Sequence, residues 1–241
     1  MKTDAITHDA FLGGRVRAWQ PAKGYRSGVD AVLLAAACPA QAGDTVLELG
    51  CGVGVASLCL SERTGATVTG VEVQPFYAAL AQKNGVDVVE TDLAQLPPDL
   101  RQRQFHHVIM NPPYFTQGLA ASDAGRQAAR AEETPLRTWL EVAAKRLRAR
   151  GVLTVIHRAE RLPDLLGAMP LGSVEVLPLQ ARVGRAAHLV LVRARKDGRA
   201  PFRLHAPLTL HAAPTHEGDH PDYVPAIHAV LHDGAPLPFP D

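Results

Sequence analysis

The sequence predicts an α/β fold built on a mainly parallel, seven-stranded sheet, with helices on both faces and an antiparallel hairpin at one edge. Short apolar segments rich in β-branched residues alternate with helical segments along most of the 241 residues. That alternation is typical of a doubly wound sheet. The last two apolar segments follow each other too closely for a helical crossover, so we expect them to pair antiparallel.

The predicted strands are short and apolar. In chain order they are Thr45–Leu49, Thr67–Val73, Val86–Glu90, Phe105–Met110, Val152–His157, Val174–Leu179 and His188–Arg195. The predicted helices lie around and between these strands. They are Val29–Cys38, Val55–Arg63, Phe76–Lys83 after Pro75, a segment from Thr134-Pro135 to about Arg150 that Thr134 caps and Gly151 ends, and a short helix reaching Met169. The Pro- and His-rich tail from Arg199 onward is expected to be irregular, with one more strand around Leu208–His211.

Composition sets limits on the class of protein. An apolar fraction of 46% with 20% charged residues allows a sizeable core and excludes global disorder. The three cysteines (Cys38, Cys51 and Cys59) lack ligand-like spacing and are typical of buried thiols in a reducing compartment. We find neither a membrane-length apolar run nor a signal peptide, and so expect a cytoplasmic protein without a membrane partner. Because the net charge is only +1, any nucleic-acid contact must depend on local positive charge.

A glycine turn, Glu48 to Gly54 (ELGCGVG), joins the first strand to the following helix. Gly50, Gly52 and Gly54 let the backbone turn sharply and approach a ligand closely. In open α/β sheets this crevice is where nucleotides bind. The spacing is GxGxG; the dinucleotide pattern would need Gly or Ala at Val55, which weakens a pyrophosphate interpretation.

Two acidic residues follow the next two strands. Glu72 lies about 20 residues past the glycines, where a carboxylate can accept both hydroxyls of a ribose. Asp92 follows the third strand, where an acceptor could meet an adenine amino group. Each residue alone is typical of a solvated loop. Together with the glycine turn, they favour a ligand that contains adenosine.

Asn111-Pro112-Pro113-Tyr114 follows the fourth strand. Asn and Pro also terminate strands, but the whole tetrapeptide predicts more. An amino group conjugated to a base or an amide is a poor nucleophile. Asn111 Oδ1 and the Pro112 carbonyl, held rigidly by Pro113, could accept its two hydrogens and favour a pyramidal nitrogen. Tyr114 offers a flat face for stacking. Alignment and preorganised acceptors then suffice, without a metal or a general base.

These features together resemble the class I methyltransferases with an NPPY motif, which use S-adenosylmethionine (SAM). The segment Gly24–Leu34 (GYRSGVDAVLL) and the strand around His188–Lys196 extend the resemblance to the bacterial tRNA1(Val) adenine-N6-methyltransferases. The resemblance implies a Rossmann-like fold, SAM as cofactor and an adenine near the anticodon as substrate. It places Asp30 near the α-amino group of the cofactor, with Glu48, Glu72 and Asp92 in the same site.

The resemblance also suggests how the chain is divided. Residues 1–200 would form the methyltransferase domain, with 1–40 as a region covering substrate and cofactor, and 201–241 would form a C-terminal extension. Arg26, Arg126 and Arg130 are candidate RNA-phosphate contacts, with Arg15, Arg17 and Lys23 nearby, and Pro113 would line the substrate pocket. The basic residues between Lys145 and Arg150 suit a helix C-terminus as well as RNA. We expect a monomer.

Two alternatives remain open. A protein-glutamine N5-methyltransferase must likewise make a conjugated nitrogen nucleophilic, namely the amide nitrogen of its glutamine substrate. That family usually carries a helical substrate domain before the glycine turn. A non-enzymatic module that binds SAM or nucleic acid would not need the intact tetrapeptide. The string from His216 to His220 (HEGDH) matches a zinc-protease motif, but an internal glycine and flanking prolines oppose the helix this motif requires. We therefore expect no metal site.

Overall fold

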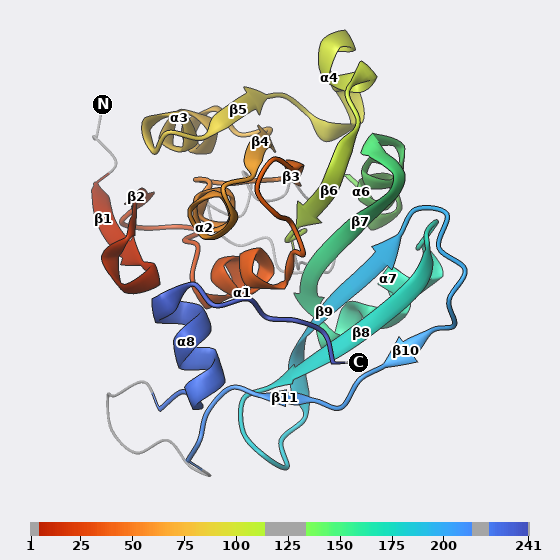
Figure 1. Ribbon diagram of the computed structural model, residues 1–241. Coiled ribbons are helices and arrows are strands. Elements are labelled where there is room, and N and C mark those ends of the chain that lie inside the picture. The colour runs from red at the N-terminus through yellow and green to blue at the C-terminus, as the bar shows by residue number, and fades with distance from the viewer. Residues whose placement is uncertain (1–4, 114–133, 214–221, 241) are drawn as a thin grey trace.

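The computed structural model describes residues 5–113, 134–213 and 222–240, and a twisted central sheet dominates it (Figure 1). The sheet order is β8-β9-β7-β6-β3-β4-β5, with β10 and β11 added beside β8. The main strands are β3 (Thr45–Leu49), β4 (Thr67–Glu72), β5 (Asp87–Glu90), β6 (Phe105–Met110), β7 (Leu147–Arg158), β8 (Gly172–Gln180) and β9 (Ala187–Arg195). Strands β7, β6, β3, β4 and β5 are parallel, and β9 is antiparallel to both of its neighbours. The predicted fold class, including the antiparallel pair, is confirmed.

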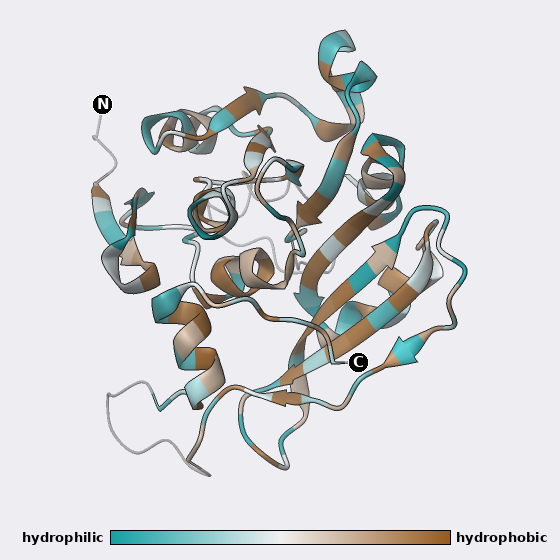
Figure 2. Ribbon diagram, in the orientation of Figure 1, coloured by the Kyte–Doolittle hydropathy of each residue, from teal (hydrophilic) through white to brown (hydrophobic). Residues whose placement is uncertain are grey.

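Helices cover both faces of the sheet. One face carries α1 (Val29–Ala37), α2 (Val55–Thr64), α3 (Pro75–Lys83) and α8 (Pro225–Asp233), and the other carries α4 (Pro98–Gln102), α6 (Leu136–Arg146) and α7 (Leu162–Gly167). Figure 2 shows apolar central strands, while α4 is mostly hydrophilic and lies, like β10 (Arg203–Leu204), at the periphery. No helix in the described ranges is both long and apolar enough to cross a membrane.

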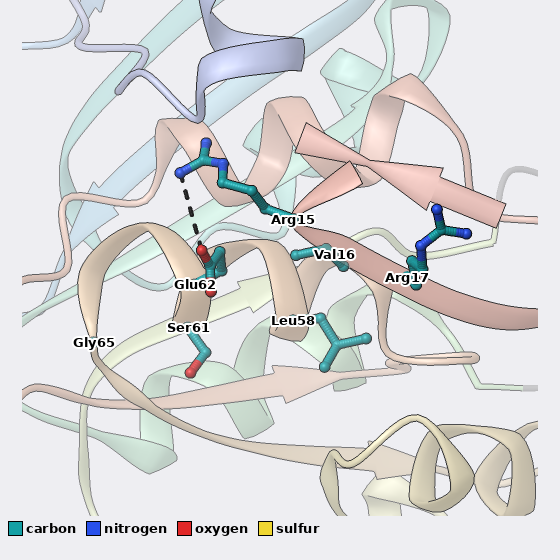
Figure 3. Close-up of a pocket in the computed structure, with 7 residues that line it drawn as sticks. All are labelled: Arg15, Val16, Arg17, Leu58, Ser61, Glu62 and Gly65. Carbon is teal, nitrogen blue, oxygen red and sulfur yellow. Dashed lines mark ion pairs between the residues drawn. The ribbon is translucent and has the colours of Figure 1, made fainter. Parts of the chain in front are cut away.

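The N-terminal segment forms a hairpin that the sequence analysis did not predict. Strand β1 (Ile6–Phe11) pairs antiparallel with β2 (Val16–Pro21) in a separate two-stranded sheet. The Asn84 side chain joins this hairpin to the body, because it bonds the backbone N–H and C=O of Trp19 and also donates to the Val53 carbonyl at 2.9 Å. A pocket of about 360 Å³ lies between the hairpin and α2, lined by Arg15, Val16, Arg17, Leu58, Ser61, Glu62 and Gly65 (Figure 3).

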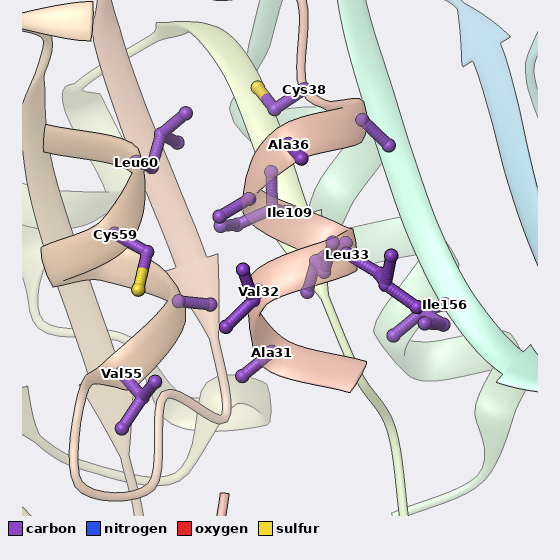
Figure 4. Close-up of a cluster of buried hydrophobic side chains, with 14 of the residues drawn as sticks. Ala31, Val32, Leu33, Ala36, Cys38, Val55, Cys59, Leu60, Ile109 and Ile156 are labelled. Atoms are coloured by element: carbon purple, nitrogen blue, oxygen red, sulfur yellow. The ribbon is translucent and has the colours of Figure 1, made fainter. Parts of the chain in front are cut away.

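Helix α1 is buried almost completely between α2 and β7. Figure 4 shows Val32 and Leu33 among side chains of α2, β6 and β7, including Leu60, Ile109 and Ile156. Its Ala- and Leu-rich sequence suits this position, since a helix that is apolar all round belongs in a core.

Three expectations about individual elements were wrong. Helix α6 ends at Arg146, and β7 begins at Leu147, because the sheet extends β7 along β6 as far as Phe105. The basic residues between 145 and 150 are therefore divided between a helix end and a strand. The cap residue of α6 is Pro135, without a side-chain hydrogen bond, so Thr134 does not cap it. The tail is not irregular apart from one strand: besides β11 (Leu208–Thr209) it contains β10 and α8, whose apolar side is buried.

The carbonyls at the C-terminal end of α1 accept hydrogen bonds from residues far away in the sequence. Arg63 donates to the carbonyls of Ala35 and Cys38 at 3.0 and 2.7 Å. Arg193 of β9 donates to the Ala37 carbonyl, and its guanidinium lies 4.2 Å from the ring centre of Phe239. The backbone N–H of Leu237 donates to the Ala36 carbonyl at 2.9 Å. Carbonyls that a helix cannot pair internally are thus satisfied inside the core.

We expect Arg193→Ala to lower the free energy of unfolding by about 2 to 3 kcal/mol, because it strands the Ala37 carbonyl and removes packing on Phe239. Arg195→Ala is the matched control, since that arginine lies two residues along the same strand and its side chain donates to the Arg150 carbonyl in an exposed hydrogen bond. The control should change stability by less than about 0.5 kcal/mol. Urea unfolding measures both, and equal losses would contradict the capping role.

Candidate active site

The glycine turn lies where β3 passes into α2. Gly50, Gly52 and Gly54 have φ of 67°, 55° and 86°, a region that side chains with a Cβ rarely adopt. A Cβ on Gly50 would lie 2.6 Å from the Trp139 ring, and one on Gly54 would lie 2.4 Å from Val86 Cγ2. Backbone conformation and packing therefore both require glycine at Gly50 and Gly54.

Glu72 holds the turn from the end of β4. Its two carboxylate oxygens accept the backbone N–H groups of Gly52 and Gln74, each at 2.9 Å, and the residue is only 6% exposed. Burial raises the pKa of Glu72 above its ordinary value, and the backbone hydrogen bonds oppose that effect. Each oxygen keeps a further lone pair. The role of Glu72 toward a ribose stays a prediction.

Glu48 lies beneath the turn, with its carboxylate turned toward α2. Ser57 Oγ donates to Glu48 Oε2 at 2.5 Å, and the residue is 4% exposed. Burial, opposed by the hydrogen bonds from Ser57, raises the pKa of Glu48 to about 8. Glu48 thus lies next to the glycine turn, and its hydrogen bond with Ser57 joins β3 to α2.

Asp92 follows β5, next along the same edge of the sheet. Its Oδ1 accepts the backbone N–H of Ala94 at 2.8 Å and caps a short 3-10 helix, Leu93–Gln95. The Thr91 N–H donates to the Glu72 carbonyl at 2.9 Å, which fixes the two strand ends relative to each other. The acidic residues predicted from separate strands therefore share one edge of the sheet with the glycine turn.

Asn111 leaves β6 beside the glycine turn. Met110 and Leu49 are register partners in the neighbouring parallel strands β6 and β3, so the next residues, Asn111 and Gly50, leave the sheet side by side. Pro112 is buried, and Pro113 is partly exposed. Three further predicted residues lie outside the described ranges: Tyr114, Arg126 and Arg130.

Tyr25 is a residue of this region that the sequence analysis did not single out. Its ring lies over the turn, because a Cβ on Gly52 would be 3.6 Å from Tyr25 Cε1. Burial of its hydroxyl end, followed by the charges of Glu48 and Asp30, raises the pKa of Tyr25 to about 12. The residue as a whole is 53% exposed. The exposed fraction refers to the whole residue, whereas the pKa depends on the surroundings of the hydroxyl group alone. An aromatic residue beside Gly24, in a segment already linked to the cofactor, was the available signal.

Other predicted residues fall around this centre. Asp30 is in the first turn of α1, near enough to Tyr25 to influence its titration. Arg26 forms an ion pair with Asp9, with 2.6 Å between Nη2 and Oδ2. The string from His216 to His220 lies outside the described ranges. Among the residues described, no three His, Cys, Asp or Glu side chains are grouped so as to hold a metal ion.

The pocket of Figure 3 is separate from this centre. Ser61, Glu62 and Gly65 place it along the C-terminal half of α2, whereas the glycine turn precedes the N-terminus of that helix.

The chemistry of these groups fits SAM. The turn allows close backbone approach, the Glu72 carboxylate would accept ribose hydroxyls, and Asp30 would add negative charge near a cationic ligand. SAM, when bound, supplies a methyl group activated by a sulfonium.

We expect stability to depend on pH through Glu48. Its folded-state pKa of about 8 exceeds the ordinary value of 4.5, so the folded chain holds the proton more tightly than the unfolded chain. The stabilising contribution is complete below about pH 4.5 and is lost as pH rises through about 8. Glu48→Gln should therefore flatten the fall in unfolding free energy over this window, measured by urea unfolding at several pH values. An unchanged slope would contradict this.

Comparison with known proteins agrees with this geometry. The chain is 28% identical over 180 residues to a protein of Haemophilus influenzae named tRNA1(Val) (adenine(37)-N6)-methyltransferase, covering 70% of this chain and 77% of that protein. A protein of Shewanella baltica with the same name is 30% identical over 181 residues, covering 70% and 76%.

Solved structures agree in fold. A predicted O-methyltransferase, Atu636 of Agrobacterium tumefaciens, superposes with a TM-score of 0.71 at 26% identity, covering 88% of this chain and all of that one. The 16S rRNA N2 G1207 methyltransferase RsmC of T. thermophilus, solved with AdoMet and guanosine, gives a TM-score of 0.55 at 22% identity, covering 80% of this chain and 50% of that one. The latter shows the fold alone.

The model of the methyltransferase small domain matches residues 27–178, which is more than half of the chain. The matched range contains the glycine turn, Glu72, Asp92 and the Asn-Pro-Pro-Tyr element. This chain therefore belongs to the methyltransferase small domain family and is a SAM-dependent methyltransferase.

Proposed function

We propose that this methyltransferase acts on the N6 amino group of an adenine in RNA, in a tRNA near the anticodon. One observation carries the proposal: Asn111 and Gly50 leave adjacent strands side by side, which brings the acceptor for an amino group next to the cofactor turn. The names of the relatives from Haemophilus influenzae and Shewanella baltica support the choice of a tRNA adenine.

The proposed chemistry depends on two acceptors. Asn111 Oδ1 and the Pro112 carbonyl each accept a hydrogen bond from one N–H of the amino group. These two bonds turn the nitrogen lone pair out of conjugation with the ring. Pro113 restricts the residue before it and so keeps that carbonyl in place. Asn111 is neutral, so it does not hold the proton that the product nitrogen must release. Tyr114 would stack on a base turned out of its helix or loop.

The predicted substrate contacts complete this proposal. Arg126 and Arg130 follow the tetrapeptide in sequence and would hold RNA phosphates. Contacts with phosphates make the affinity for RNA fall as the salt concentration rises. This salt dependence distinguishes an RNA substrate from a small uncharged molecule.

The glutamine N5 alternative would use the same two acceptors. The names of the relatives from Haemophilus influenzae and Shewanella baltica support an adenine in tRNA over a protein glutamine as the substrate.

The test is methyl transfer from labelled SAM to total tRNA, to DNA and to protein, followed by nucleoside analysis. We expect N6-methyladenosine in tRNA. Asn111→Ala should reduce transfer by about 100-fold or more, because one preorganised acceptor is lost.

The control for Asn111→Ala is cofactor affinity, which should stay within about threefold of the wild type if Asn111 acts on the amino group. Label in protein alone would overturn the RNA substrate. Full activity of Asn111→Ala would overturn the chemistry.

A further inference from the structure

A short strap, residues 22–28, runs from β2 to α1 across the glycine turn, and a set of polar contacts fixes one side of it. Gln20, which is 1% exposed, accepts the Ser27 N–H at 2.8 Å and donates to the Ser27 carbonyl at 3.2 Å. The same amide donates to Asp9 Oδ2 at 2.7 Å. That oxygen also receives Arg26 Nη2 at 2.6 Å. Asp9, Gln20 and Arg26 thus form one connected group, here called the latch.

The other side of the strap presents Tyr25 to the glycine turn. Its ring meets that of Tyr77 edge to face, with 6.4 Å between centroids, and Tyr77 Oη donates to the Tyr25 carbonyl at 3.5 Å. The nearest atom to a Cβ built on Gly52 belongs to the Tyr25 ring. The Tyr25 ring therefore lies between Gly52 and Tyr77, and the Tyr25 carbonyl accepts a hydrogen bond from Tyr77. The residue is nevertheless 53% exposed.

The Tyr25 ring is neutral and lies near acidic residues. Burial above all, and then the charges of Glu48, Asp30 and Glu72, raise the pKa of Tyr25 to about 12. Because the pKa of Glu48 is itself about 8, the negative charge near the ring at neutral pH comes from Asp30 and Glu72. A neutral aromatic face beside carboxylates attracts a cation, because the ring quadrupole and the carboxylates act in the same direction.

We propose that Tyr25 is a cofactor-retaining residue, whose ring closes over SAM at the glycine turn, and that the Asp9–Gln20–Arg26 latch holds it there. Arg26 then serves cofactor retention through Asp9 and is not an RNA contact. The inference rests on the methyltransferase assignment and is independent of which substrate receives the methyl group.

The chemistry predicts which part of Tyr25 matters. The ring supplies contact area and its quadrupole, and both remain in phenylalanine. Removal of the ring loses both and opens the turn to water. The latch acts at a distance, because Asp9 and Arg26 pair with each other and, through Gln20, hold the strap that carries Tyr25.

The first test measures SAM binding by calorimetry and its dissociation rate by competition, without any RNA. Tyr25→Ala should weaken SAM binding about tenfold or more, mainly through faster dissociation, and Tyr25→Phe should stay within about threefold of the wild type. Phe202→Ala is the matched control, an aromatic residue that is 54% exposed on the C-terminal side of the chain. It should leave SAM affinity unchanged.

A purely structural role is separated by thermal unfolding. The Tm of Tyr25→Ala without ligand should equal that of the wild type, while the rise in Tm on adding SAM should shrink. An affinity within twofold of the wild type, or a loss of Tm without ligand that accounts for the weaker binding, would overturn the proposal.

The second test concerns the latch. Arg26→Ala and Asp9→Asn should each weaken SAM binding about threefold to tenfold, and the double variant should lose no more than the worse single one, because the pair acts as a unit. Arg185→Ala, an exposed arginine in the turn before β9, is the control. If Arg26→Ala lowers RNA affinity and leaves SAM affinity intact, the latch is refuted. Absence of methyl transfer to RNA, with these SAM affinities as expected, would overturn only the proposed substrate.

Discussion

The hydrogen bond from the Gly52 N–H to Glu72 is the contact on which the rest of the site depends. It joins the loop after β3 to the end of β4, and the second bond from Gln74 fixes the carboxylate itself. Because Gly50 and Gly54 leave no room for a Cβ against Trp139 and Val86, the turn is held from several sides. A backbone positioned in this way can approach a ligand closely without rearranging. The Tyr25 ring lies against the same turn, so the position of the turn also fixes the position of the strap.

The α1 helix connects this site with both ends of the chain. Its N-terminus follows the strap and carries Asp30, while its last carbonyls are bonded by Arg63, Arg193 and the Leu237 amide. Polar groups buried without such partners would each cost about 1 to 3 kcal/mol. The C-terminal tail is thus part of the same cooperative unit as the methyltransferase core, although it lies beyond the family match that ends at residue 178.

Local charge has more influence on function here than net charge. The chain carries only +1 overall, yet the acidic side chains of Asp30 and Glu72 both act on the hydroxyl of Tyr25 beside the glycine turn. This arrangement favours a cationic cofactor. The same negative charges would repel a phosphate backbone. Basic residues that lie away from the glycine turn are therefore better placed to contact RNA. The Asp9–Arg26 pair shows how a basic residue that sequence alone associates with RNA can have its charge engaged within the protein.

The sequence by itself determined the order of the seven main strands, the glycine turn and the acidic residues at the strand ends, because periodicity, glycine spacing and strand termini are local properties. The chemical roles assigned to Asn111, Pro112 and Pro113 stay predictions, as do those of Tyr114, Arg126 and Arg130. Only the tertiary structure decided where α6 gives way to β7, that the N-terminus forms a hairpin and that the tail includes α8. Those outcomes depend on pairing with Phe105, on the Asn84 contacts and on burial against α1. Such long-range contacts bring together residues far apart in sequence, and no local pattern contains them.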